Sequence, residues 1–274
     1  MKRKSKERRF PNRRGRLSRL RNATASQGKR PSLRPRIAGV IASRADLGRA
    51  LGMRKPPDLF ELRLDCLADV VEQHRKSSPA RDVWLELENK LPRLRAPLII
   101  TARHPQEGGA NPATAGSLRR RRDLLTRFLP HADYVDVELR SASALRSLLT
   151  LAKQKKVFRI ISFHDFKSTP PLRVLCAKAR AAKTHGADIF KVATRTDTPV
   201  QLARLLDFIA KKSVALSVAA MGIGKLGGIS RVLLARAGSA LVYASVGKSD
   251  IEGQLSIGQL RMLGIASRRY ASRR

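Results

Sequence analysis

Short apolar runs alternate with longer amphipathic stretches along most of the chain, beginning near residue 37. Runs of five to seven apolar residues are typical of buried strands. They predict eight strands, at Ile37–Ser43, Leu59–Leu64, Pro97–Arg103, Tyr134–Glu138, Val157–Phe163, Asp188–Ala193, Val214–Ala219 and Ala240–Ser245. Stretches between them with apolar residues at three-to-four spacing and no internal proline predict helices. The clearest are Leu118–Leu129, Ala142–Gln154, Leu172–His185, Val200–Lys211 and Ser230–Ala237.

Strands that alternate with helices favour parallel pairing in a single sheet. Eight such units in about 235 residues predict a (β/α)8 TIM barrel, at the small end of that fold's range. Residues 37–274 are therefore expected to form one catalytic domain. Because active sites in this fold lie at the carboxyl ends of the strands, polar residues at those ends are the candidates for chemistry.

The first 36 residues differ sharply from the rest in composition. They carry fifteen lysines and arginines against Glu7, a net charge of +14, which leaves +22 of the total +36 on the rest of the chain. So few apolar residues cannot offset the entropy of ordering, and residues 1–36 are predicted to be a disordered basic tail. The tail is either an arm that binds nucleic acid or ribosomes, or a mis-assigned start or solvated extension. Non-specific attraction of polyanions is expected in each case.

The number of cysteines and the length of the apolar runs limit the possible metal sites, disulfides and cellular locations. Cys66 and Cys176 stand alone, which fits neither a disulfide framework nor a metal cluster, so no metal site is predicted. No apolar run approaches the roughly 18 residues of a membrane span, and the N-terminus lacks the apolar segment of a secretory signal. A cytoplasmic protein is expected.

Charged residues gather at the ends of the second and third predicted strands. Glu61, Arg63 and Asp65 alternate along the second strand, so their side chains share one face. They form either part of a binding site or a salt-bridged cluster that closes the barrel mouth. Arg103 ends the third strand before the turn-forming Gly108-Gly109, in a position to bind hydroxyls or a carboxylate.

His164 and Lys191 end the fifth and sixth strands, and both suit chemistry on a carbonyl compound. Imidazole titrates near neutral pH, so His164 is a candidate proton carrier, although a histidine beside Asp165 is often structural. An amine in an apolar strand is costly unless it is used or paired, so Lys191 is either a nucleophile or the partner of Glu61 or Glu138. Burial and nearby cations would supply the free amine that carbonyl attack requires.

After the seventh strand the sequence contains a formal G-x-G-x-x-G pattern at Gly222, Gly224 and Gly227. In a dinucleotide site this pattern comes early and is followed by an acidic residue at the end of the next strand, and both features are missing here. The segment instead favours an anion cradle at a helix start, with Arg231 holding a substrate carboxylate.

Together these segments resemble the type I 3-dehydroquinate dehydratases, the 3-dehydroquinases of the shikimate pathway, over residues 36–265. The segments that carry the resemblance are Glu61 to Asp65, Arg103 to Gly109, Ser162 to Phe166 with Thr169-Pro170, Lys191 to Ala193, Ile229 to Arg231 with Gly238 to Ala240, and Gly253-Gln254. The resemblance implies a cofactor-free syn dehydration of 3-dehydroquinate to 3-dehydroshikimate by a homodimeric hydro-lyase.

The resemblance also implies roles for individual residues. Lys191 would form a Schiff base with the C3 ketone, and His164 would take the C2 proton and return one to the C1 hydroxyl. Either Glu138 or Glu107 would orient His164. Substrate-binding positions of the family match Glu61, Arg63, Arg103, Arg231 and Gln254. Of these, Arg231 would anchor the C1 carboxylate, and Gln254 lies in the closing loop.

One segment departs from the family pattern. The closing loop of the family has Ser-Ala-Pro-Gly-Gln, where this chain has Asp250-Ile-Glu252-Gly253-Gln254. A carboxylate at Asp250 near an anionic substrate would weaken binding by on the order of 1 kcal/mol. An Asp250→Ser variant is expected to have a lower KM. Two rival hypotheses remain: another Schiff-base barrel such as a class I aldolase, and a degenerate barrel whose basic surface binds nucleic acid.

Overall fold

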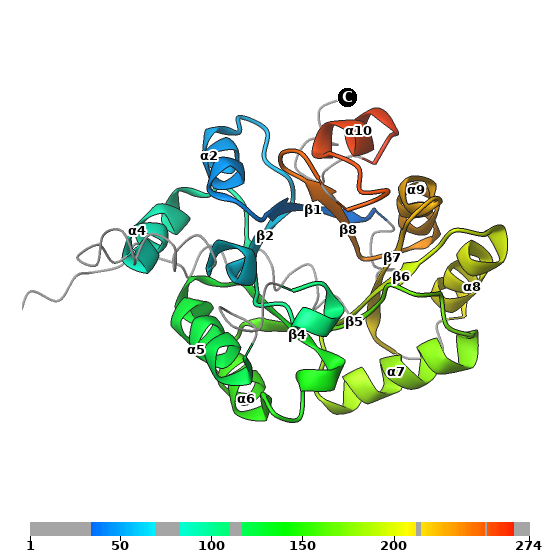
Figure 1. Ribbon diagram of the computed structural model, residues 1–274, viewed down its shortest axis with the longest axis horizontal. Helices are drawn as coiled ribbons and strands as arrows, with labels where there is room; N and C mark the ends of the chain where they lie inside the picture. The colour runs from blue at the N-terminus through cyan, green and yellow to red at the C-terminus, as the bar shows by residue number, and fades with distance from the viewer. Residues whose placement is uncertain (1–33, 69–82, 110–116, 212–214, 250, 266–274) are drawn as a thin grey trace, which may run out of the picture. The chain divides into compact units, whose positions relative to one another are not determined.

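The computed structural model of the protein describes residues 34–68, 83–109, 117–211, 215–249 and 251–265 (Figure 1). Eight strands form one sheet. They are β1 (Arg36–Ile41), β2 (Leu59–Arg63), β3 (Leu98–Thr101), β4 (Tyr134–Glu138), β5 (Phe158–Asp165), β6 (Ile189–Arg195), β7 (Ser217–Ile223) and β8 (Leu241–Ser245). Each strand pairs in parallel with its neighbours, in the order β7-β6-β5-β4-β3-β2-β1-β8.

The sheet closes on itself between β7 and β8. The Ala240 amide donates to the Val218 carbonyl at 2.7 Å, and the Ser239 hydroxyl accepts from the Ala220 amide at 3.0 Å. This seam has few hydrogen bonds compared with the other strand pairs, which are joined by regular parallel ladders. The predicted (β/α)8 barrel is confirmed.

Helices lie outside the ring of strands (Figure 1). The α-helices are α2 (Arg44–Gly52), α4 (Val83–Lys90), α5 (Leu118–Phe128), α6 (Arg146–Gln154), α7 (Leu172–Thr184), α8 (Pro199–Ala210), α9 (Gly227–Ala237) and α10 (Ile257–Met262). Short 3-10 turns are η1 (Leu91–Arg93), η2 (Pro105–Glu107), η4 (Leu129–His131) and η5 (Leu139–Ser141). Residues at helix N-termini favour the start of several helices. In α8, Thr198 and Gln201 form a capping box, and Pro199 occupies the first helical position.

Alternation along each strand separates the two sides of the barrel wall. On β6, Phe190 is fully buried and packs edge-on against Phe208 of α8, with ring centroids 6.1 Å apart. Burying a side chain of this size contributes about 1.5–3 kcal/mol. Ile189 belongs instead to the apolar cluster in the barrel interior, with Leu59, Ile160 and Leu241. Lys191, two residues after Ile189, is thereby directed into the barrel.

Most strand boundaries differ from the sequence-based prediction by one or two residues, and the largest difference is in the seventh strand. The seventh strand was expected at Val214–Ala219 but spans Ser217–Ile223, so it lies three to four residues further along the chain. Its alanines and Gly222 have low intrinsic strand preference, and tertiary pairing with β6 overrides that preference. The fifth and sixth strands continue to Asp165 and Arg195, which places His164 within β5.

Parts of the chain that the sequence analysis discussed lie outside the described structure. Strand β1 begins at Arg36, so the last residue of the predicted tail belongs to the barrel. Its guanidinium donates to the Tyr134 hydroxyl at 2.8 Å. Residues 1–33 of the predicted disordered tail lie outside the described residues, and so does Asp250. Within the described residues no helix is long and apolar enough to cross a membrane.

Candidate active site

Lys191 occupies the centre of the barrel mouth, with only 3% of its surface exposed. Its Nζ donates to Glu61 Oε1 on β2 and to Asp136 Oδ2 on β4, both at 3.0 Å. The same nitrogen lies 3.9 Å from the ring centroid of Tyr243 on β8. Side chains from three strands far apart in sequence therefore surround one amine. The sequence-based alternative that Lys191 pairs with Glu61 is thus seen in the structure, together with a second carboxylate that the sequence did not single out.

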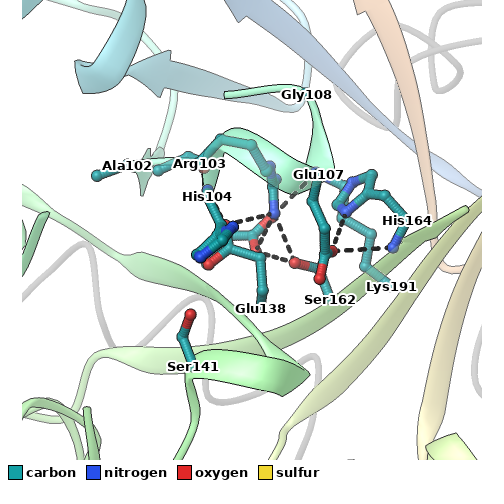
Figure 2. Close-up of polar contacts among 12 residues, drawn as sticks. Ala102, Arg103, His104, Glu107, Gly108, Glu138, Ser141, Ser162, His164 and Lys191 are labelled. Carbon is teal, nitrogen blue, oxygen red and sulfur yellow. Dashed lines mark hydrogen bonds and ion pairs between the residues drawn. The ribbon is translucent and has the colours of Figure 1, made fainter. Parts of the chain in front are cut away.

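Arg103 holds the carboxylates around this amine. Its guanidinium donates to Asp136 at 2.9 and 3.2 Å. It also donates to Glu138 at 3.1 Å and to the Ser162 hydroxyl at 2.6 Å (Figure 2). Burial by itself would raise the pKa of Asp136, but Arg103 and Lys191 outweigh burial and hold that pKa well below its usual range. Asp136 therefore stays ionised beside the amine.

His164 forms a pair with Glu107 of η2. Glu107 Oε2 accepts the His164 backbone N–H at 3.0 Å and lies 3.0 Å from Nδ1 of the ring; Figure 2 shows the two side chains next to each other. Burial and the cations Arg103 and Lys191 hold the pKa of His164 well below its ordinary value, so the imidazole is neutral at pH 7. With Nδ1 directed at Glu107, Nε2 is left to exchange protons.

Glu107 is itself unusual, because burial and the nearby charge of Glu138 raise its pKa to about 7. The sequence left open whether Glu138 or Glu107 contacts His164. In the structure Glu138 faces the other way: it accepts from the fully buried guanidinium of Arg121 on α5, from Arg103 and from the His104 amide at 3.0 Å. The carboxylate in contact with His164 is therefore that of Glu107.

Arg63 lies at the end of β2 in a bidentate pair with Asp65, at 3.0 and 2.7 Å. Burial opposes the charge on Arg63, but Asp65 outweighs it and raises the pKa of the guanidinium further. Arg63 also donates to the Gly108 carbonyl at 3.1 Å, which ties the loop after β3 to β2. The three residues predicted to share one face of the strand do not all lie on it, because Asp65 lies in a helical segment after the end of β2. Asp65 forms a local salt bridge with Arg63, whereas Glu61 contacts Lys191.

Arg231 of α9 is a buried cation without a carboxylate partner among the described residues, and 3% of its surface is exposed. Its guanidinium donates only to carbonyls, at 2.6 Å to Gly222, 2.9 Å to Gly253, 3.1 Å to Gly227 and 3.3 Å to Tyr243. Burial lowers its pKa to about 10. A buried, uncompensated guanidinium is a ready site for an anion.

The glycines beside Arg231 allow the backbone around Gly253 to lie in close contact with the backbone around Gly227. Gly253 has a φ of +76°, and a Cβ there would meet the Cα of Gly227 at 2.6 Å. The Gly224 amide already donates to the Glu252 carbonyl at 3.2 Å, and the Gly227 amide donates to the Gly224 carbonyl at 2.8 Å. Because these amides are engaged, an anion at this helix start would depend on Arg231 more than on the expected backbone cradle.

The loop that carries Gln254 is held by contacts on both sides of residue 250. Gln254 Oε1 accepts from the Ser249 hydroxyl at 2.5 Å, and Glu252 pairs with Arg195 at the end of β6 at 3.1 Å. Arg195 also donates to Asp197 at 2.6 Å. The loop thus rests against both β6 and α9.

Three residues of this region were not singled out from the sequence. Asp136 shares its alternating face with Glu138, which was a usable signal. Arg121 lies within a run of four arginines in α5, and Tyr243 lies in an apolar strand. The residues that Arg121 and Tyr243 contact lie far away in the sequence, so the local sequence pattern gave no indication of these contacts. Among the described residues, no group of three or more metal-ligating side chains has the geometry to hold a metal ion.

A (β/α)8 barrel with a buried amine, a neutral imidazole and an uncompensated guanidinium at its mouth defines a class of barrel enzymes that act on anionic carbonyl compounds. The chain belongs to the type I 3-dehydroquinase family, whose model matches residues 42–266. This match confirms the resemblance inferred from the sequence.

Individual relatives agree with this assignment. The chain is 32% identical to the 3-dehydroquinate dehydratase of Shouchella clausii (strain KSM-K16) over 226 residues, which is 80% of this chain and 84% of the relative. It is 31% identical to the 3-dehydroquinate dehydratase of Geobacillus kaustophilus (strain HTA426) over 214 residues, which is 76% of this chain and 79% of the relative. The crystal structure of the G. kaustophilus enzyme superposes with a TM-score of 0.70 at 28% identity, covering 84% of this chain and 89% of that one.

Proposed function

We propose that the protein is a 3-dehydroquinate dehydratase of the shikimate pathway, with Lys191 as its Schiff-base lysine and His164 as its acid–base residue. The observation that supports these roles best is the position of the Lys191 amine. It lies in the barrel mouth, between Glu61 and Asp136, and in the same charge network as the neutral imidazole of His164.

The first stage joins enzyme and substrate. The Lys191 ammonium first passes a proton to the neutral imidazole of His164. The lone pair of the free amine then attacks the C3 carbonyl carbon, and a proton from the attacking nitrogen moves to the carbonyl oxygen to give a carbinolamine. Loss of that oxygen as water, with His164 as proton donor, leaves a protonated imine. The positive nitrogen then withdraws electrons from C2, so the C2 proton becomes acidic.

The second stage is the elimination. Nε2 of His164 takes the C2 proton, and the electron pair of that bond forms an enamine. The enamine then expels the C1 hydroxyl, which leaves as water with the proton that His164 returns. Water adds to the resulting conjugated imine, releasing 3-dehydroshikimate and the free Lys191 amine. The imidazole of His164 thus releases every proton that it takes up, and Glu107 keeps this imidazole in one orientation.

Substrate positioning is divided among the surrounding cations. Among the residues that the structure describes, Arg231 has no anionic partner, so it would bind the C1 carboxylate, and Gln254 would close over the ring. Glu61 and Arg63 would hold ring hydroxyls. Arg103 is occupied by Asp136, Glu138 and Ser162, so we infer that it acts mainly by fixing the charges around Lys191.

Borohydride trapping tests the proposal. Hydride addition to the imine carbon converts it to a stable secondary amine, so borohydride plus 3-dehydroquinate should inactivate the enzyme and add mass to the peptide that contains Lys191. Lys191→Ala should show no adduct and a kcat lower by about 10⁴-fold or more. The matched control is Lys178→Ala, since Lys178 lies on α7 with its amine 4.0 Å from the Phe163 ring, and it should remain active and trappable.

Other results would support the rivals. An adduct with a different carbonyl compound and none with 3-dehydroquinate would indicate a class I aldolase. The absence of any adduct or turnover would favour a basic barrel that binds nucleic acid. We further propose a cytoplasmic homodimer with non-specific polyanion binding through residues 1–36, which sedimentation velocity with and without heparin would test.

A further inference from the structure

Tyr243 is the aromatic residue nearest the reacting nitrogen, and the mechanism above assigns it no part. It lies on β8 with 3% of its surface exposed, and the face of its ring is 3.9 Å from Lys191 Nζ. Its phenol oxygen is the one buried side-chain polar atom without a hydrogen-bond partner in the described part of the chain. Tyr243 therefore presents its ring face to the Lys191 amine.

The number of N–H groups on Lys191 changes during the reaction. An ammonium has three, and two of them bond to Glu61 and Asp136. A protonated imine on the same nitrogen has only one N–H, so at most one of these two hydrogen bonds can persist. The positive charge remains while the hydrogen bonds that stabilised it are halved.

An aromatic face attracts a cation without needing an N–H group, because the attraction comes from the ring quadrupole. We propose that Tyr243 is a catalytic residue whose ring face stabilises the iminium formed on Lys191, when that nitrogen has lost a carboxylate hydrogen bond. This inference rests on the proposed Schiff-base function. Strand β8 would then contact the reacting nitrogen directly through Tyr243, and the loop that follows β8 would contribute Gln254.

A substitution series separates the ring's charge distribution from its shape. Tyr243→Phe keeps the ring and removes the unpartnered hydroxyl, so kcat should stay within about threefold of the parent. Trifluorophenylalanine at position 243 keeps nearly the same shape with a weakened quadrupole, and kcat should fall below that of the Phe variant by about threefold to tenfold. Tyr243→Leu should lower kcat by about tenfold or more, and should reduce the fraction of enzyme that borohydride traps at saturating substrate.

The matched control is Tyr134→Leu. Tyr134 is equally buried in the barrel interior, stacks on Phe158 and has no contact with Lys191 in the structure. This variant should unfold at a lower temperature yet keep the kcat and trapped fraction of the parent while folded. A drop in trapping as large as that of Tyr243→Leu would show that any lost interior ring has this effect, and would overturn the inference.

The two proposals fail in different ways. If the parent enzyme forms no adduct with 3-dehydroquinate, the Schiff-base function itself is wrong. If the parent is trapped and the trifluorophenylalanine and Phe variants have equal kcat and equal trapping, the function stands and the role of the Tyr243 face is wrong.

Discussion

At the scale of single residues, burial disfavours the charged forms of both Glu107 and His164 and so shifts their pKa values in opposite directions. The pKa of Glu107 is about 7, above its ordinary 4.5, because of burial and the charge of Glu138. Burial and two cations lower the pKa of His164. A group whose pKa is raised on folding stabilises the fold fully below its unfolded value and loses that contribution as pH rises through its folded value. Glu107 therefore loses its contribution to stability progressively from pH 4.5 to pH 7, and its ionised carboxylate destabilises the fold at all higher pH.

Replacing Glu107 by glutamine should expose this cost. Glutamine does not ionise, and its carbonyl still accepts from the His164 amide and ring. Between pH 5 and pH 8 the free energy of unfolding of the parent should fall by about 2 kcal/mol relative to that of Glu107→Gln. Turnover at pH 8 should decrease by about tenfold or more, because the imidazolium loses its anionic partner. Urea unfolding at both pH values and kcat measure the two effects.

Glu86→Gln is the control for this comparison. Glu86 is half-exposed on α4 and pairs with Lys90 at 2.6 Å. This variant should follow the parent in both pH dependence of unfolding and kcat. Parallel unfolding curves for the parent and Glu107→Gln across pH 5 to 8 would show that Glu107 titrates normally.

At the scale of elements, the loop after β8 is joined to β6 by the pair of Arg195 and Glu252 at 3.1 Å. Both side chains are partly exposed, so the pair contributes little to folding. Its effect is expected on the position of the loop that holds Gln254. Glu252→Gln should raise KM by about twofold to fivefold at low salt with little change in kcat.

Salt dependence identifies this effect. The KM difference between the parent and Glu252→Gln should shrink at about 0.5 M salt, because exposed charges are screened. Glu88→Gln is the matched control, since Glu88 pairs with Arg127 at 2.8 Å on the outer helices. It should leave KM unchanged. Equal KM for all three proteins at low salt would contradict a role for Glu252 in positioning the loop.

The sequence predicted elements well where local patterns are strong. The β4 boundaries were predicted without error, because an alternating apolar run ends at Glu138. The seventh strand was displaced because its Ala, Gly and Ser residues gain strand structure only from pairing with β6. Lys191 and His164 were singled out as candidates because a polar group at the end of an apolar strand is conspicuous. Tyr243 and Arg121 were missed, since their significance depends on which distant side chains barrel closure brings to them.

At the scale of the whole molecule, the basic N-terminal residues should be separable from the catalytic domain. The cut must leave Arg36 in place, because its amide bonds to the Ala240 carbonyl at 3.1 Å and its side chain to Tyr134. Removing residues 1–33 should leave kcat, KM and the unfolding temperature unchanged and should reduce retention on heparin. A loss of turnover would show that the catalytic domain begins earlier in the chain.

The contacts of Arg231 span the β7–β8 seam. Its guanidinium bonds to the Gly222 carbonyl of β7 and the Tyr243 carbonyl of β8, the two strands that a regular ladder does not join. A carboxylate bound to that guanidinium would neutralise the charge on the bridge and so favour the closed barrel. Ligand occupancy and global folding are then linked equilibria, and product accumulating in a cell would protect the enzyme against unfolding and proteolysis.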